Sequence, residues 1–107
     1  MRKILVNSLI AIVSVTGAAA HADTDTAYAA GGCSIILSSF AGAISRMGNQ
    51  QSADNAVKYA VKYNSIGRNA GDPTAFAAGQ QWAQNFARTH TVKELAAKAD
   101  QCVEIFH

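Results

Sequence analysis

The stretch DTAYAAGGCSIILSSFAGAISRMGN, residues 25–49, decides the fold of this chain of 107 residues. Its apolar side chains recur mostly at intervals of three and four residues, which is the period of one helix face. These side chains are Ala29, Cys33, Ile36, Leu37, Phe40, Ile44 and Met47. Asp25 or Thr26 supplies an N-cap, and Gly48-Asn49 supplies a left-handed stop. We therefore predict one long helix between these signals.

A second helix is predicted after this stop. It begins at the cap candidate Ser52 and ends near residues 64–67. The residues expected on its buried face are Ala53, Ala56, Val57, Ala60 and Val61. The other face carries Asp54 and Lys58, four residues apart, as a favourable exposed pair.

Two further helices follow. Asp72-Pro73 places a capping carboxylate before a proline at the first helical position. The stripe predicted to face inward from this third helix is Phe76, Gly79, Ala83, Phe86, Ala87 and His90. Thr91 and Glu94 form a capping box for the fourth helix. Its predicted inward residues are Val92, Leu95, Ala96, Ala99, Cys102, Val103 and Phe106.

Helical spacing without any run of alternating hydrophobicity predicts an all-α fold, a small four-helix bundle with up-down-up-down topology. In that topology the start of the first helix lies beside the end of the fourth, where Cys33 and Cys102 occur. We expect one disulfide between them, which in the chain-entropy model contributes roughly 4 kcal/mol for a loop of this length. Abundant alanine, with Gly42 and Gly79, indicates close approach between helices.

Residues 1–22 resemble a secretory signal peptide, which leaves residues 23–107 as a single helical domain. Arg2 and Lys3 precede an apolar run, and Ala20 and Ala22 provide a small-residue cleavage site after Ala22, with Ala20 as the alternative. A retained membrane anchor is the competing interpretation, because the apolar run is close to the length that spans a bilayer. A lipoprotein signal at Cys33 is disfavoured, since the apolar run ends well before it. We expect a periplasmic or secreted protein.

Export changes the charge of the chain. The full sequence has nine basic and seven acidic residues, and loss of Arg2 and Lys3 leaves seven of each. A neutral chain lacks the surplus of cations that phosphate binding requires. We therefore expect no nucleic-acid partner, and no stable membrane insertion after signal cleavage.

No catalytic motif stands out in the sequence. His90 and the terminal His107 are the histidines that follow the signal. His90 lies at the junction of the third and fourth helices, where a histidine commonly bonds helix-end carbonyl groups. A small hydrolase that uses His90 is one alternative function, and an envelope stress chaperone is another. We expect no metal, because neither short CxxC nor HxxxH spacing occurs, and no cofactor.

Aromatic side chains with polar tips indicate a binding function instead. Tyr59 and Tyr63 are predicted to project from the flank of the second helix beside Lys58 and Lys62, and Trp82 from the flank of the third. Such residues often anchor protein interfaces. Our leading hypothesis is a non-catalytic protein that binds a protein partner in the cell envelope, as an inhibitor or immunity-type module. One alternative is that the aromatic residues seal the edges of the core. Another is that the cluster of Lys58, Lys62 and Arg68 contacts an anionic envelope component.

Overall fold

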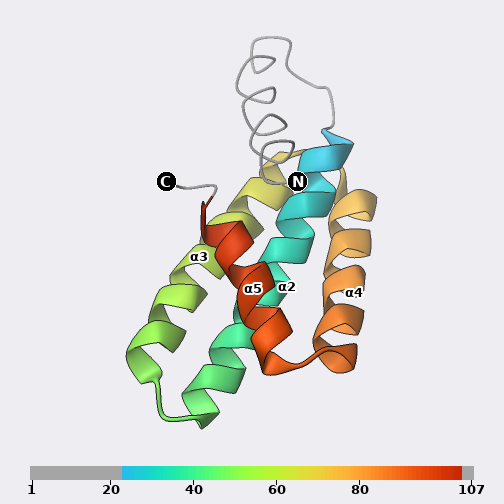
Figure 1. Ribbon diagram of the computed structural model, residues 1–107. Helices are drawn as coiled ribbons and strands as arrows, with labels where there is room; N and C mark the ends of the chain where they lie inside the picture. The colour runs from blue at the N-terminus through green and yellow to red at the C-terminus, as the bar shows by residue number, and fades with distance from the viewer. Residues whose placement is uncertain (1–22, 105–107) are drawn as a thin grey trace.

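The computed structural model describes residues 23–104, and this part of the chain is helical apart from short turns. Its helices are α2 (Thr24–Arg46), α3 (Gln50–Asn69), α4 (Pro73–Thr89) and α5 (Val92–Glu104). Figure 1 shows that α2 and α4 run in one direction and α3 and α5 in the other. The predicted up-down-up-down bundle of four helices is therefore confirmed. The predicted signal peptide and the residues Phe106 and His107 lie outside the described range.

Two of the predicted helix starts are confirmed by their capping hydrogen bonds. Asp72 accepts the backbone N–H of Ala75 at 3.0 Å, and Pro73 takes the first helical position of α4. At the start of α5, the Thr91 N–H donates to the Glu94 carboxylate at 2.9 Å, and the Glu94 N–H donates to Thr91 Oγ1 at 3.2 Å. This reciprocal pair is a capping box. Donation from the Thr91 N–H keeps the pKa of Glu94 below its usual value.

The first helix starts slightly earlier than predicted. Asp23, rather than Asp25 or Thr26, caps α2, because the Asp23 side chain accepts the backbone N–H of Thr26 at 2.9 Å. The early start brings Thr24 into α2, where its hydroxyl donates to the Asp72 carboxylate at 2.6 Å. This bond joins the starts of α2 and α4 and is the main reason that the pKa of Asp72 lies below its usual value.

The turn between α2 and α3 also differs from the prediction in one residue. Gly48 has a φ angle of 89°, a left-handed conformation that glycine adopts without steric cost. Asn49 has a negative φ and takes no part in this left-handed stop. Its side chain instead accepts the backbone N–H of Ser52 at 3.3 Å, so Asn49 caps α3 and the predicted cap, Ser52, lies inside the helix.

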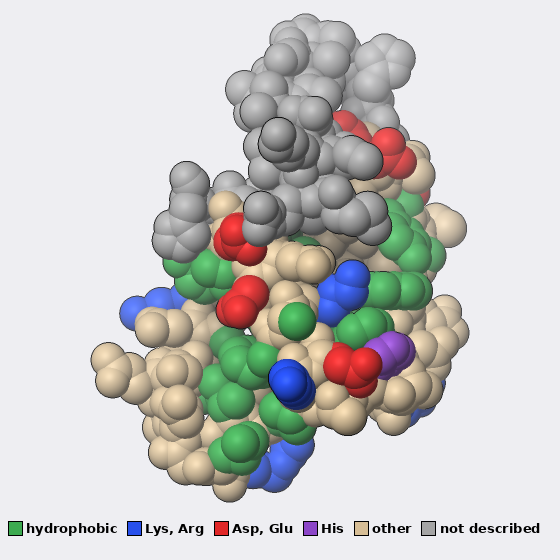
Figure 2. All heavy atoms as spheres, in the orientation of Figure 1, with side chains coloured by type: hydrophobic (Ala, Val, Ile, Leu, Met, Phe, Trp, Pro, Cys, Tyr) green, Lys and Arg blue, Asp and Glu red, His purple; other side chains and the backbone are tan. Residues whose placement is uncertain are grey.

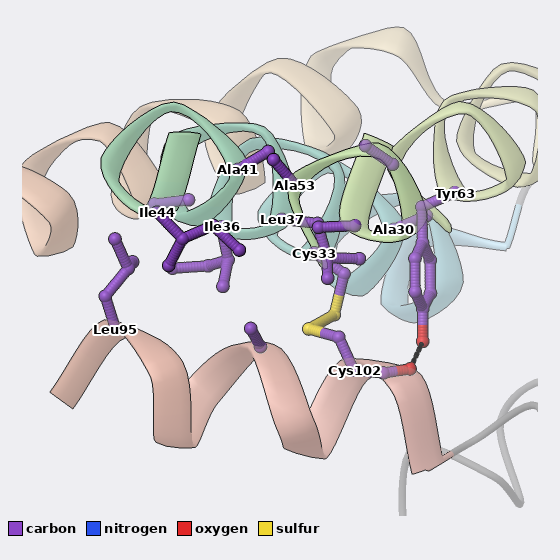
Figure 3. Close-up of a cluster of buried hydrophobic side chains, with 14 residues drawn as sticks. Ala30, Cys33, Ile36, Leu37, Ala41, Ile44, Ala53, Tyr63, Leu95 and Cys102 are labelled. Carbon is purple, nitrogen blue, oxygen red and sulfur yellow. Dashed lines mark hydrogen bonds between the residues drawn. A yellow bond between two sulfur atoms is a disulfide. The ribbon is translucent and has the colours of Figure 1, made fainter. Parts of the chain in front are cut away.

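Helix α2 is the axis of the bundle, because it packs against α3, α4 and α5 while α3 and α4 scarcely touch each other. The side chains of Ile36 and Leu37 are each 1% exposed at the centre of the core. Figure 3 shows these side chains between α5 and the other helices. Among the described helices, α2 is also the one whose length and composition would suit a bilayer. Its apolar surface is mostly covered by its three neighbours, as expected for a core helix.

Contact between α2 and α4 depends on glycine. A Cβ atom on Gly79 would overlap the carbonyl group of Tyr28 in α2, and one on Gly31 would overlap the carbonyl group of Phe76 in α4. The two backbones therefore touch directly, as small residues allow at a helix crossing. The close approach predicted from Gly79 is confirmed, whereas Gly42 takes no part in it, since a Cβ there would approach nothing nearer than the Arg46 guanidinium at 3.7 Å.

The substitutions Gly79→Ala and Gly42→Ala test this contact as a matched pair. Both replace a glycine inside a helix, and such a change alone stabilises a helix by about 1 kcal/mol. We expect Gly42→Ala to be neutral or stabilising, and Gly79→Ala to lower the free energy of unfolding by about 1–3 kcal/mol through overpacking. Urea denaturation measures both values. A gain of stability in both variants would show that the backbones do not meet.

Candidate functional site

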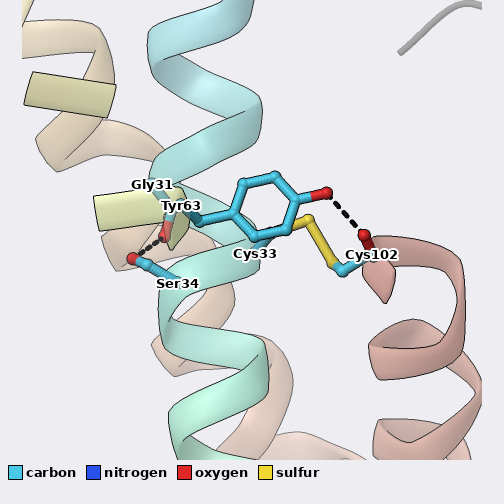
Figure 4. The surroundings of a disulfide bond; sticks show 5 residues. All are labelled: Gly31, Cys33, Ser34, Tyr63 and Cys102. Carbon is cyan, nitrogen blue, oxygen red and sulfur yellow. Dashed lines mark hydrogen bonds between the residues drawn. A yellow bond between two sulfur atoms is a disulfide. The ribbon is translucent and has the colours of Figure 1, made fainter. Parts of the chain in front are cut away.

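The disulfide between Cys33 and Cys102 is formed as predicted, and it joins α2 to α5 (Figure 4). The two Cα atoms lie 5.7 Å apart, and the bond spans 69 positions of sequence. Both cysteines are buried, at 6% and 5% exposure. The bond thus holds the last helix against the axis of the bundle and leaves no free thiol among residues 23–104.

Tyr63 belongs to the core and not to the surface. Its side chain is 1% exposed, and its hydroxyl donates to the carbonyl oxygen of Cys102 at 2.5 Å, as Figures 3 and 4 show. The prediction that Tyr63 projects from the flank of the helix is wrong, because it continues the buried row of Ala56, Ala60 and Gly67. Burial raises the pKa of Tyr63 well above its usual value. Tyr63 therefore fastens α3 to α5.

Replacing Tyr63 with phenylalanine tests this role. The Tyr63→Phe variant keeps the ring but leaves the Cys102 carbonyl oxygen without this donor, so we expect the free energy of unfolding to fall by about 1–3 kcal/mol. Tyr28→Phe is the matched control, since the Tyr28 side chain is 43% exposed, and we expect no measurable change there. Thermal or urea denaturation of both proteins decides the matter. Equal stability of the two variants would show that the Tyr63 hydroxyl does not stabilise the fold.

Trp82 lies where the sequence predicted, on the flank of α4, and is 41% exposed. Its ring centroid is 5.5 Å from that of Phe86, and the amine of Lys98 in α5 lies 5.8 Å from the Trp82 ring and 5.9 Å from the Phe86 ring. A cation over an aromatic face is attracted by the electron density of the ring. The indole is thus held at the seam between α4 and α5 with much of its surface in solvent.

His90 extends the same aromatic row. Its ring stacks on Phe86 with centroids 3.8 Å apart, and Nδ1 lies 2.9 Å from the Phe86 carbonyl oxygen. Because a carbonyl oxygen only accepts, Nδ1 carries the proton and donates it there. The predicted bond to a helix-end carbonyl is confirmed, but His90 is exposed and not on an inward face.

The hydroxyl group of Thr89, which lies next to His90, already has a hydrogen-bond partner in the helix. Thr89 Oγ1 lies 2.9 Å from His90 Nδ1, but it also lies 2.8 Å from the carbonyl oxygen of Asn85, the usual partner of a threonine at a helix end. A hydrolase that uses His90 would need a concave pocket around this residue. His90 is not among the residues that line the pocket between α2, α3 and α4.

The remaining predicted binding residues lie on α3. Tyr59 is partly buried against the core, and the amine of Lys62 lies 5.3 Å from its ring centroid, while Lys58 is exposed. Tyr59 is one helical turn before Tyr63, which bonds to α5, whereas Trp82 meets α5 from the side of α4. Figure 1 shows α5 between α3, which carries Tyr59, and α4, which carries Trp82.

The face of the bundle that α5 covers carries charges of both signs. Figure 2 shows acidic and basic side chains interspersed with apolar ones over the side that α5 covers. A surface for nucleic acid would instead gather cations. Within residues 23–104, no three His, Cys, Asp or Glu side chains lie close enough to share a metal ion.

The structure also contains a groove that the sequence did not predict. It is lined by Ser34, Ile35 and Ser38 of α2, by Gln80 of α4, and by Val57, Ala60, Val61 and Asn64 of α3. Its volume is about 190 Å³. Ser38 follows Cys33 by five residues, which is about 140° around the helix, so the groove opens away from α5.

Two residues that were predicted to be buried line this groove and are exposed to solvent. Val57 is 47% exposed and Val61 is 63% exposed, so their assignment to the core is wrong. The apolar face of α3 is wider than α2 alone can cover, and α4 is too distant to cover the remainder. Val92, also predicted to face inward, is 42% exposed in the first turn of α5.

Comparison with known proteins assigns no relative to this chain. No family model, no curated protein and no solved structure matches it.

Proposed function

We propose that this protein acts in the cell envelope, without catalysis, by binding a protein partner as an inhibitor or immunity-type module. The single observation that carries the proposal is Trp82, a large aromatic side chain that is 41% exposed yet fixed in position by Phe86 and Lys98. Tryptophan is among the residues most enriched where binding energy concentrates in protein interfaces.

The fixed position of Trp82 matters for affinity. Ordering a flexible side chain on binding costs free energy, and a ring already held by its neighbours loses less freedom. Lys98 adds a positive charge beside the apolar ring surface. The surface therefore suits a partner that presents an apolar side chain next to a carboxylate, which the Lys98 amine would meet.

Export is supported by the disulfide. Disulfides persist in oxidising compartments such as the periplasm and the extracellular space, and are rare in the cytosol. The Cys33–Cys102 bond connects helices that are far apart in sequence, so it supports a protein that folds in such a compartment. The predicted signal peptide at residues 1–22 is consistent with this location.

The proposal predicts that Trp82→Ala loses the partner. Wild-type protein immobilised in its disulfide-bonded form should capture a partner from envelope extract, and Trp82→Ala should bind that purified partner at least tenfold more weakly, because residues of this kind contribute about 2 kcal/mol or more. Met47→Ala is the control, since Met47 is 71% exposed at the turn between α2 and α3.

Intrinsic fluorescence gives a second measurement. Trp82 is the one tryptophan of the sequence, so its emission should shift to the blue when a partner covers it. Equal capture by wild type, Trp82→Ala and Met47→Ala, with no change in emission, would contradict the proposal.

A further inference from the structure

We infer that two copies of this protein form a two-fold symmetric dimer in which the exposed edges of their α3 helices at Val57 and Val61, beside the groove, pack against each other. The groove opens away from α5, whereas Trp82 lies at the seam of α4 and α5. The dimer therefore leaves Trp82 exposed on both copies, and it does not depend on the proposed function.

The groove is lined by apolar and polar side chains, and Val57 and Val61 are its exposed apolar edge. The hydroxyl of Ser34 donates to the carbonyl oxygen of Gly31 at 2.8 Å, and the hydroxyl of Ser38 donates to that of Ser34 at 2.8 Å. Both hydroxyl protons are used within α2. Val57 and Val61 lie beside these serines at 47% and 63% exposure. Two exposed valines on one helix edge can pack against the same edge of a second copy.

Charged residues on either side of Val61 indicate which partner would pack against this edge of α3. Asp54 precedes Val61 by seven residues and Arg68 follows it by seven, and both side chains are exposed. Seven residues are close to two helical turns, so all three lie on one side of α3, with about 10 Å from Val61 to each charge. The row thus carries one negative end and one positive end, with Val61 as its apolar middle and Lys58 and Asn64 beside Val61.

This pattern complements itself when two α3 helices pair antiparallel. A two-fold axis at Val61 places Asp54 of each copy opposite Arg68 of the other, which gives two ion pairs. Lys58 falls opposite Asn64 and meets no like charge at that position. Parallel pairing would instead set Asp54 against Asp54 and Arg68 against Arg68. The arrangement of charge therefore favours a second copy in the antiparallel orientation.

Charge reversal tests this dimer. Sedimentation analysis of the disulfide-bonded protein across a range of concentrations should show a monomer–dimer equilibrium for wild type. Asp54→Arg and Arg68→Asp should each weaken the dimer about tenfold or more, because each converts two attractive contacts into two repulsive ones. The double variant Asp54→Arg/Arg68→Asp restores opposite charges and should return to within about threefold of the wild-type dissociation constant.

A second pair of variants tests the apolar middle. Val61→Lys places two charges at the axis and should leave the protein monomeric, while Met47→Lys, at the distant turn, should dimerise as wild type does. Circular dichroism confirms that each variant is folded, as expected for changes at exposed positions. A wild-type protein that stays monomeric, single reversals without effect, or a double variant that fails to recover would each overturn the dimer. An α3 edge that is covered only by a different protein would do so as well.

Discussion

The bond between Cys33 and Cys102 is the constraint on which the arrangement of the bundle depends. Helix α5 is the shortest of the described helices and buries only Leu95, Ala99 and Cys102, of which one is a large aliphatic side chain. Burial of so little apolar surface offers limited free energy against the cost of ordering a helix. The disulfide keeps α5 close to α2, and the bond from Tyr63 to the Cys102 carbonyl sets the same end of α5 against α3. With α5 in place, the buried side of α2 is closed.

Helix α2 meets its neighbours in three different ways, and each has a functional consequence. It meets α4 through glycine, with the backbones in direct contact. It meets α5 through the disulfide, and the seam between α5 and α4 displays Trp82. Between α3 and α4 it has no covering helix, and the groove results. One exposed surface therefore offers an aromatic side chain held by its neighbours, and the other offers a groove whose α3 edge carries two exposed valines between opposite charges.

Local signals predicted this fold well, because they depend on neighbouring residues. The Asp72-Pro73 start and the Thr91–Glu94 capping box both appear in the structure. The disulfide is a long-range contact, but it was predictable because two cysteines allow only one pairing. The errors concern which helix faces are covered. Helical spacing places Val57 and Val61 beside the buried alanines of α3, but it does not reveal how many helices will pack against that face. The same lack of information explains the error at Tyr63, whose burial depends on the position of α5. It also explains the error at Gly42, which faces open space, whereas Gly79 faces the backbone of α2.

Hydrogen exchange of the backbone amides tests the role of the disulfide most directly. The measurement compares the disulfide-bonded protein with the Cys33→Ser/Cys102→Ser variant, helix by helix. In the chain-entropy model, removing the bond restores roughly 4 kcal/mol of chain freedom to the unfolded ensemble, which lowers the stability of the whole bundle. If the bond also holds α5 in place, the amides of α5 lose protection before those of the other helices. The amides where α2 and α4 cross at Gly31 and Gly79 should remain the slowest to exchange. Unchanged protection of α5 in the variant would contradict this account.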